Sequence, residues 1–272
     1  MKQSRISWTG QVKIYIGKCY RIFINERGWK NLISTVIIAI IISWVAGEDL
    51  FHTFADTQNG AFSLVCAGIW VGIFNSIQSI CRERGIIKRE HRTGLRISSY
   101  ISARMSFETV ICLLQALIMV VILYVFRSPP ETGIIMPPFL ELFITFFLVI
   151  FSSDVLGMLV SSNVKNETQA VTVMPFILIL QLVMSGIIFT LNDTAAIFAN
   201  LTISKWGVNA ICSIADINAM PDAIIFGDYD KSAFEFTSEN LLMIWGILLG
   251  FALLYGLLSI VTLKLFIDKD KR

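Results

Sequence analysis

Six apolar runs, separated by short polar segments, dominate the sequence. They cover residues 32–46, 61–80, 101–126, 139–160, 170–191 and 241–267. A helix needs roughly 20 apolar residues to cross a hydrocarbon core about 30 Å thick, so most of these runs are long enough to span a membrane. The first run is short, and we expect its helix to begin near Trp29, with the indole at the membrane interface.

These runs define the fold class. Backbone groups in lipid must be satisfied internally, and runs of this length are too long for barrel strands. The sequence therefore predicts an all-α integral membrane protein with six transmembrane helices. Its composition agrees, because 55% of the 272 residues are hydrophobic, only 15% are charged, and the mean hydropathy is +0.71.

A different pattern precedes the first run. Apolar residues, among them Trp8, Val12, Tyr15 and Cys19, recur at three- and four-residue steps within residues 1–30, with lysine, glycine and arginine largely on the other side. The pattern predicts an amphipathic connecting helix lying along the inner membrane surface. Two roles stay open for it: anchoring the chain, or presenting a polar face to a cytoplasmic partner.

Charge is distributed unevenly between the connectors. Lysine and arginine gather before the first run, between the second and third runs, and after the last, and Lys165 lies between the fourth and fifth, whereas the other connectors are mainly acidic. By the positive-inside rule, both termini and the basic segment 81–100 are cytoplasmic. Six spans require that both termini share a side, which agrees with this orientation. We expect a multi-pass protein of the cell (plasma) membrane, anchored in its lipid bilayer.

The predicted organisation has three parts. Residues 1–30 form the connecting helix, residues 31–267 the six-helix transmembrane domain, and residues 268–272 a cytoplasmic tail. Residues 192–240 are the sizeable outer segment, too short to fold alone. Because residues 195–216 are apolar, we expect this segment to be re-entrant, dipping back into the interface as short helices.

Catalytic chemistry is not indicated. The histidines, His52 and His91, lie outside the runs, so a membrane hydrolase would lack a base. Gly17-Lys18 is followed by Cys19 and has no glycine at the required earlier position, so no phosphate-binding loop is present. We therefore expect no catalytic residues, no metal site and no cofactor on this chain. The net charge of +2 combines a basic and an acidic side of the membrane and does not indicate a nucleic-acid partner.

Three acidic residues fall within the runs. Glu108 follows Arg104 by four residues and could pair with it along the helix, and Glu141 lies near the outer end of its run. Asp154 lies deeper, where an ionised side chain is costly. A structural role for Asp154, paired or facing the bundle interior, is favoured over a role in transport.

The segment 81–100 carries a resemblance to a known family. Glu83-Arg84, Lys88-Arg89-Glu90, Gly94 and Ser98-Ser99-Tyr100 resemble the first intracellular loop of the G (White) subfamily of ABC transporters, within the ABC-2 class of exporter permeases. Residues 175–189, ending in Ser-Gly and two isoleucines, are similar to that family's fifth span, and residues 203–210 to a segment of its outer loop. Trp8, Gln11 and residues 25–27 resemble its connecting helix.

The resemblance implies a half-transporter that works as a dimer with ATPase subunits. The second permease would be another copy or a paralogue, and the ATPase a separate chain that carries ATP and Mg. The loop would contain a cytoplasmic coupling helix whose contact residues are Arg82, Glu83, Arg84, Lys88, Arg89 and Glu90. The resemblance also places a gate at Ile187 and Ile188, and a substrate cavity along Gly68, Val71, Asn75, Phe176, Leu180 and Val183.

We therefore expect a permease subunit of an ATP-driven exporter. Apolar cavity walls would suit an amphipathic or hydrophobic substrate such as a peptide, an antibiotic-like natural product or a lipid. A second interpretation stays open: a non-transporting immunity or sensor subunit that binds a peptide from outside through residues 192–240.

Overall fold

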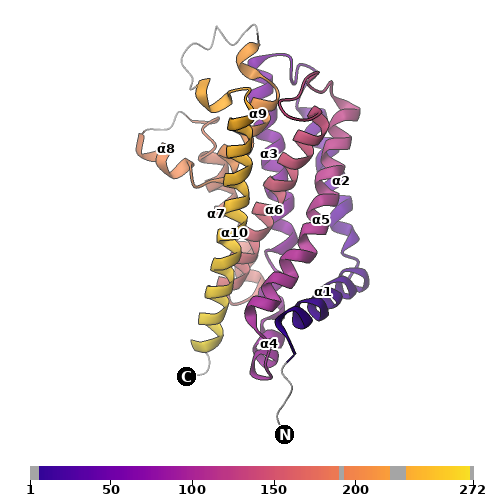
Figure 1. The fold of residues 1–272 in the computed structure, drawn as a ribbon, viewed down its shortest axis with the longest axis vertical. Helices are drawn as coiled ribbons and strands as arrows, with labels where there is room; N and C mark the ends of the chain where they lie inside the picture. The colour runs from indigo at the N-terminus through magenta and orange to yellow at the C-terminus, as the bar shows by residue number, and fades with distance from the viewer. Residues whose placement is uncertain (1–5, 190–192, 221–230, 270–272) are drawn as a thin grey trace.

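The computed structural model describes residues 6–189, 193–220 and 231–269, and this part of the chain contains helices and no strands. The helices of the bundle run up and down side by side (Figure 1). They are α2 (Trp29–Val45), α3 (Phe54–Ser76), α5 (Ile97–Phe126), α6 (Pro138–Asn163), α7 (Glu167–Val183) and α10 (Ser238–Lys269). Two further helices, α1 (Trp8–Asn25) and α4 (Ser79–Arg92), lie at the end of the bundle where α10 finishes (Figure 1).

The all-helical membrane fold is confirmed. Within the described residues, four helical segments are long and apolar enough to cross a membrane: 54–92, Ile97–Phe126, Pro138–Asn163 and 238–267. A fifth is counted if α1 and α2, which are bent by 68° relative to each other, form one span. Helix α7 is apolar but has only 17 residues. Six crossings therefore require both α2 and α7 to span.

Helix α6 forms the centre of the bundle and packs against α3, α5, α9 and α10. Small residues allow α3 and α6 to approach closely. A Cβ added to Gly72 would lie 2.3 Å from the carbonyl oxygen of Ile150, and one added to Gly157 would lie 2.5 Å from Ser76 Oγ. Helices in lipid associate through such close packing, because lipid provides little hydrophobic driving force between them.

The start of α2 agrees with the sequence. Trp29 is its first residue, as predicted, and about half of this side chain is exposed. The turn before it contains Arg27 in the left-handed region, with φ 57°, where the chain bends between α1 and α2.

Three helix boundaries differ from those predicted. Helix α3 begins earlier, at Phe54, because the Thr53 hydroxyl accepts a hydrogen bond from Asp56 N and caps the helix. Helix α5 begins at Ile97, so the end of segment 81–100 belongs to the first turn of a long helix. Helix α7 ends at Val183, so the predicted run to Leu191 is too long. Gly186, with φ 81°, directs the chain away from the helix axis soon after that end.

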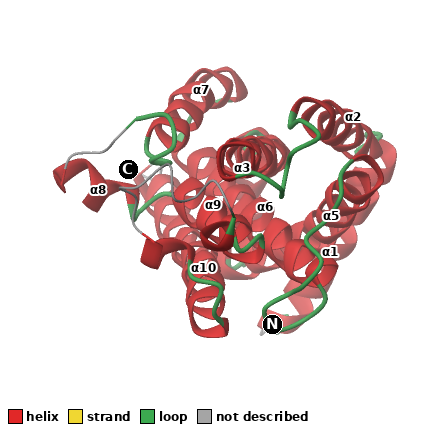
Figure 2. Ribbon diagram, turned by 90° about the horizontal axis from the view of Figure 1, so that it is seen from above, coloured by secondary structure: helices red, strands yellow, loops and turns green. Residues whose placement is uncertain are grey.

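Part of the outer segment folds back onto the bundle. Helix α8 (Asp193–Ala199) projects to one side, whereas α9 (Ile203–Ile214) packs against α3, α6 and α10 (Figures 1 and 2). Gln181 of α7 fixes α9 in place, because its side-chain oxygen accepts hydrogen bonds from Ile203 N at 3.0 Å and Ser204 N at 3.2 Å. Seen from above, α3 stands between α2 and α7 (Figure 2).

Candidate functional site

Helix α4 is a polar, amphipathic helix at one end of the bundle. Its buried side chains, Ile80, Cys81 and Ile87, form one face, and its last turn is basic. Ile80 and Ile87 join a small hydrophobic core with residues from the start of α5 and the ends of α6 and α10. This core is separate from the main core of the bundle, so the end of the molecule that carries α4 has packing of its own.

The first attachment of α4 is to the end of α6. Gln78, the residue before α4, makes no side-chain cap. Ser161 of α6 caps the helix instead, because its Oγ accepts hydrogen bonds from Ile80 N and Cys81 N, both at 3.0 Å. Arg84 donates to the carbonyl oxygens of Ser161 and Ser162 at 3.1 and 2.7 Å, where α6 ends. Each helix terminus therefore satisfies backbone groups of the other.

The same arginine also reaches α10. The Arg84 guanidinium lies over the ring of Phe266, with its central carbon 3.9 Å from the ring centroid. A guanidinium suits this position because it can donate hydrogen bonds in its plane while its face contacts an aromatic ring. Arg84 thus joins three helices and is an internal structural residue of this end of the bundle.

The second attachment of α4 is to α1. Tyr15 donates a hydrogen bond to the Glu90 carboxylate, and Lys18 pairs with Glu83 at 3.0 Å. Burial, followed by the hydrogen bond and the charge of Glu90, raises the pKa of Tyr15, so the phenol stays protonated as the donor. Arg82 pairs with Glu26 at 2.8 Å, at the end of α1.

The turn after α4 is held by α1 as well. Gln11 is buried although polar, and its amide satisfies two backbone groups: it donates to the Gly94 carbonyl at 3.1 Å and accepts from Arg96 N at 3.0 Å. Trp8 Nε1 donates to Ser98 Oγ at 3.2 Å. Helix α1 is therefore hydrogen-bonded to the turn that connects α4 to α5 and to the start of α5.

These contacts divide the predicted coupling residues into two groups. Glu83, Arg84 and Glu90 bind other helices of the same chain, and Lys88 is half-buried. Arg89 is exposed, and Arg82 is exposed while paired with Glu26. The free surface of this end also includes residues that the sequence reasoning missed, namely Gly85, Arg92, Thr93 and Arg96.

The helical spacing in the sequence places the exposed and the attached residues on different sides of α4. Gly85, Arg89 and Arg92 recur at steps of four and three residues, as Ile80, Ile87 and Arg84 do on the attached side. The sequence could not show that Arg84 binds within the chain, because its hydrogen-bond partners, Ser161 and Ser162, lie 77 and 78 residues away.

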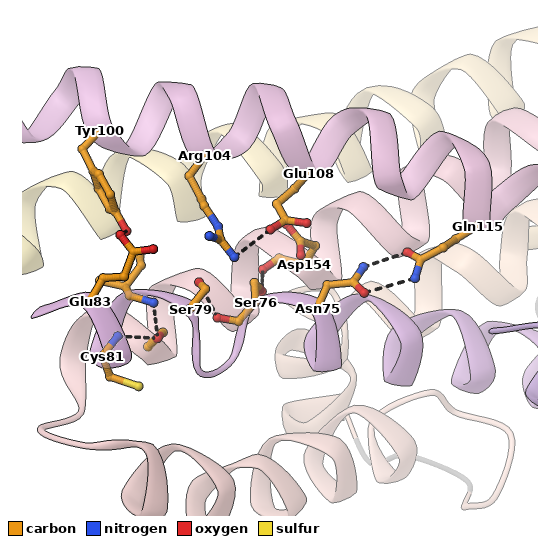
Figure 3. A network of polar contacts seen from close by, with 12 residues as sticks. Asn75, Ser76, Ser79, Cys81, Glu83, Tyr100, Arg104, Glu108, Gln115 and Asp154 are labelled. Carbon is orange, nitrogen blue, oxygen red and sulfur yellow. Dashed lines mark hydrogen bonds and ion pairs between the residues drawn. The ribbon is translucent and has the colours of Figure 1, made fainter. Parts of the chain in front are cut away.

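A polar network continues from α4 into the bundle (Figure 3). The amides of Asn75 and Gln115 bond to each other at 2.7 and 3.1 Å, and Gln115 also donates to Thr35 Oγ1 at 3.1 Å, so α2, α3 and α5 are joined. The predicted pair of Arg104 and Glu108 is confirmed, with a separation of 3.0 Å.

Asp154 completes this network without a side-chain partner. Its carboxyl group is fully buried and makes no hydrogen bond within the described part of the chain, whereas its backbone carbonyl accepts one from Ser76 Oγ. The Asp154 carboxyl interacts electrostatically with Glu108 and Arg104. The expectation that it faces the bundle interior is therefore confirmed.

The residues predicted to line a substrate cavity fall in two different environments. Gly68 is buried, and a Cβ there would lie 3.2 Å from Val149 of α6; Val71 is buried too, and Asn75 is bonded to Gln115. On α7, Phe176 and Leu180 are exposed by 70% and 53%, and Val183 is half-buried. The two groups therefore differ in exposure: Gly68 and Val71 of α3 are buried inside the bundle, whereas Phe176 and Leu180 of α7 are exposed.

The predicted gate residues follow the end of α7. Ile187 is half-buried and packs against the main core, whereas Ile188 is 49% exposed. The two neighbours therefore differ in exposure. Among the described residues, no group of three or more histidine, cysteine, aspartate or glutamate side chains could hold a metal ion.

The fold and this site define a class of protein: a multi-pass helical membrane protein in which a polar helix is fixed across one end of the bundle. Residues 11–215 match the family model described as ABC-2 type transporter, which covers most of the chain. The chain therefore belongs to the ABC-2 type transporter family and is a membrane component of such a transporter, with several apolar helices.

One curated relative is the ABC transporter ATP-binding/permease protein Rv1747 of Mycobacterium tuberculosis. The chain is 27% identical to it over 210 residues, which is 72% of this chain and 24% of the relative. The chain thus spans about a quarter of that protein, whose name combines an ATP-binding and a permease function.

Proposed function

We propose that this chain is the permease subunit of an ATP-driven exporter, and that α4 is its coupling helix. Family membership supports a transporter, and the relative's name pairs a permease with an ATP-binding part. ATP and Mg would be bound by ATP-binding-cassette subunits, here on separate chains. Both termini would be cytoplasmic, with six crossings that include α2 and α7.

The observation that carries this proposal is the attachment of α4 on one side only. Ser161, Arg84 and Glu90 hold it to α6, α10 and α1, while Arg89 and Arg92 remain exposed. A helix fixed in this way moves together with the helices that hold it. A partner that displaces the exposed face would therefore displace α1, α6 and α10 as well.

Transport would take place where two protomers meet. The exposed apolar face of α7, with Phe176 and Leu180, would line a cavity between a pair of permeases, and Ile187 and Ile188 would close it toward the outside. Because this face is apolar, the cargo would be amphipathic or hydrophobic: a peptide, an antibiotic-like natural product or a lipid.

The test is co-purification followed by reconstitution. The chain is purified from its native membrane in mild detergent, bound ATP-binding-cassette subunits are identified by mass spectrometry, and ATP-driven uptake of a fluorescent amphiphile is measured in inside-out vesicles. The variant Arg89→Glu/Arg92→Glu should lose most of the bound ATPase. The matched control Lys165→Glu/Lys264→Glu changes two exposed lysines elsewhere and should retain it.

Two results would overturn the proposal. A chain that binds no ATPase and instead binds a peptide added from outside would be the sensor or immunity subunit. Equal retention of ATPase by both double variants would show that α4 is not the docking helix.

A further inference from the structure

A cavity of about 500 Å³ lies where α1 turns into α2, and neither the coupling contacts nor the family comparison assigns it a role. We call it the turn cavity. Its walls come from α1, the turn itself, and the adjacent ends of α3, α4 and α5. Its volume is within the range of small-molecule binding sites.

The turn cavity has an excess of positive charge. Its acidic residues, Glu26, Glu83 and Glu108, each pair with a basic residue that also lines it. The pairs are Arg82–Glu26, Lys18–Glu83 and Arg104–Glu108. Arg27 and Lys30 also line it, and neither has an ion pair with any residue that the structure describes. Two cationic side chains in the cavity lining are therefore not neutralised by a described acidic residue.

Further donors face the same space. Gln78 lines the cavity and its side-chain amide has no hydrogen-bond partner among the described residues. Arg104 Nε is buried and likewise without a partner within the described chain. The N-cap residue of α2, Gly28, lies here and provides no side-chain hydrogen bond, so the positive end of the α2 dipole adds to the field. All of these groups favour an anion with several acceptor oxygens.

Part of the cavity wall is apolar. Phe23 and Phe107 form an edge-to-face pair with ring centroids 5.7 Å apart, and Ile111 continues this surface. Phe74 lines the cavity and is 51% exposed, and its neighbour Trp70 is 42% exposed. Trp29, at the start of α2, sets the level of the membrane interface. With Trp29 at the interface, the cavity would adjoin both headgroups and acyl chains.

We propose that the turn cavity binds the phosphate-bearing headgroup of an anionic membrane lipid, with Arg27 and Lys30 as its main contacts. The acyl chains would lie against Phe74 and Trp70. Basic pockets between membrane helices recognise such headgroups in this way. A bound lipid would hold α1, and with it the attached α4, against α3 and α5.

The test measures retained lipid. The protein is placed in nanodiscs that contain phosphatidylglycerol and phosphatidylcholine, extracted in mild detergent, and weighed by native mass spectrometry. The variant Arg27→Glu/Lys30→Glu should bind phosphatidylglycerol at least about tenfold more weakly than the wild type, because two contacts are reversed. The control Lys13→Glu/Arg21→Glu has the same change of net charge on exposed positions of α1 and does not line the cavity.

Each result has one meaning. Loss of phosphatidylglycerol in the cavity variant only, with unchanged phosphatidylcholine, supports the proposal. Equal losses in both double variants would show diffuse surface attraction and overturn it, as would a wild type that retains neither lipid.

Two further measurements complete the test. Inorganic phosphate is added as a competitor. If it displaced bound phosphatidylglycerol at an equal molar concentration, the occupant would be a free anion and the lipid assignment would be overturned. The variant Arg27→Gln/Lys30→Gln should lie between wild type and charge reversal. None of these measurements involves an ATPase, so their failure leaves the proposed function untouched.

Discussion

Replacing Ser161 by alanine should release the start of α4 from α6 while leaving the bundle folded. Ser161 is fully buried, and its hydroxyl oxygen accepts hydrogen bonds from two backbone donors, Ile80 N and Cys81 N. In S161A both donors remain inside the protein without an acceptor. The loss resembles removal of a helix N-cap, except that the cap comes from another helix.

The magnitude follows from these two bonds. A lost N-cap costs about 0.5 to 2 kcal/mol, and a buried donor left without a partner about 1 to 3 kcal/mol. Arg84 still holds α4 to the end of α6 through two carbonyl oxygens, which limits the movement. We therefore expect α4 to open locally more easily by about 2 to 3 kcal/mol, or roughly 30- to 150-fold.

Hydrogen–deuterium exchange in nanodiscs measures this directly. Peptides that cover residues 79–92 should exchange faster in S161A, while peptides from the centre of α6 should not change. The control Ser106→Ala removes an exposed hydroxyl that bonds only within its own helix. If exchange in α4 were the same in S161A as in the wild type, the proposed attachment to α6 would be refuted.

Three further predictions concern other contacts. Gln181→Ala should expose α9 to limited proteolysis, since it removes the acceptor for two buried amides, whereas Gln181→Glu should keep an acceptor and most of the protection. Tyr15→Phe should destabilise the packing of α1 against α4 by about 1.5 to 3 kcal/mol, measured by hydrogen–deuterium exchange in α1. Unchanged exchange would contradict a stabilising hydrogen bond from Tyr15 to Glu90. Because the folded pKa of Tyr15 is raised, this contact should be fully present below about pH 10 and lost as the pH rises through the raised value. The protection of wild-type α1, corrected for the intrinsic pH dependence of amide exchange, should therefore not vary between about pH 6 and 9. Gly72→Ala should lower the melting temperature strongly, because the new Cβ would lie 2.3 Å from a backbone oxygen. The control Gly85→Ala, whose Cβ would have no atom within 4 Å, should be neutral or stabilising. Equal melting temperatures for the two variants would contradict the close packing of α3 and α6.

Local features of the site were predictable from the sequence. The pair of Arg104 and Glu108 follows from their four-residue spacing, and the start of α2 at Trp29 from the position of an interfacial indole. Both depend on neighbours within one or two helical turns. The polar helix within segment 81–100 was expected too, although only from the resemblance to a family.

Partners distant in sequence were not predictable. Arg84 and Glu90 were expected to face an ATPase, yet they bind α6 and α1 of the same chain. The end of α7 was missed for a related reason: apolar residues continue past Val183, and only the backbone at Gly186 shows that the helix has stopped.

The sequence by itself determined that this is an all-helical membrane protein, because hydropathy and the need to satisfy backbone groups in lipid both act along the chain. Only the tertiary structure decided which face of α4 is attached, where α9 is buried, and that Arg27 and Lys30 line the turn cavity without an ion pair to any described residue. Those features depend on contacts between residues such as Ser161 and Ile80, which lie 81 positions apart. Sequence periodicity shows that a helix has a polar face, whereas folding determines what that face contacts.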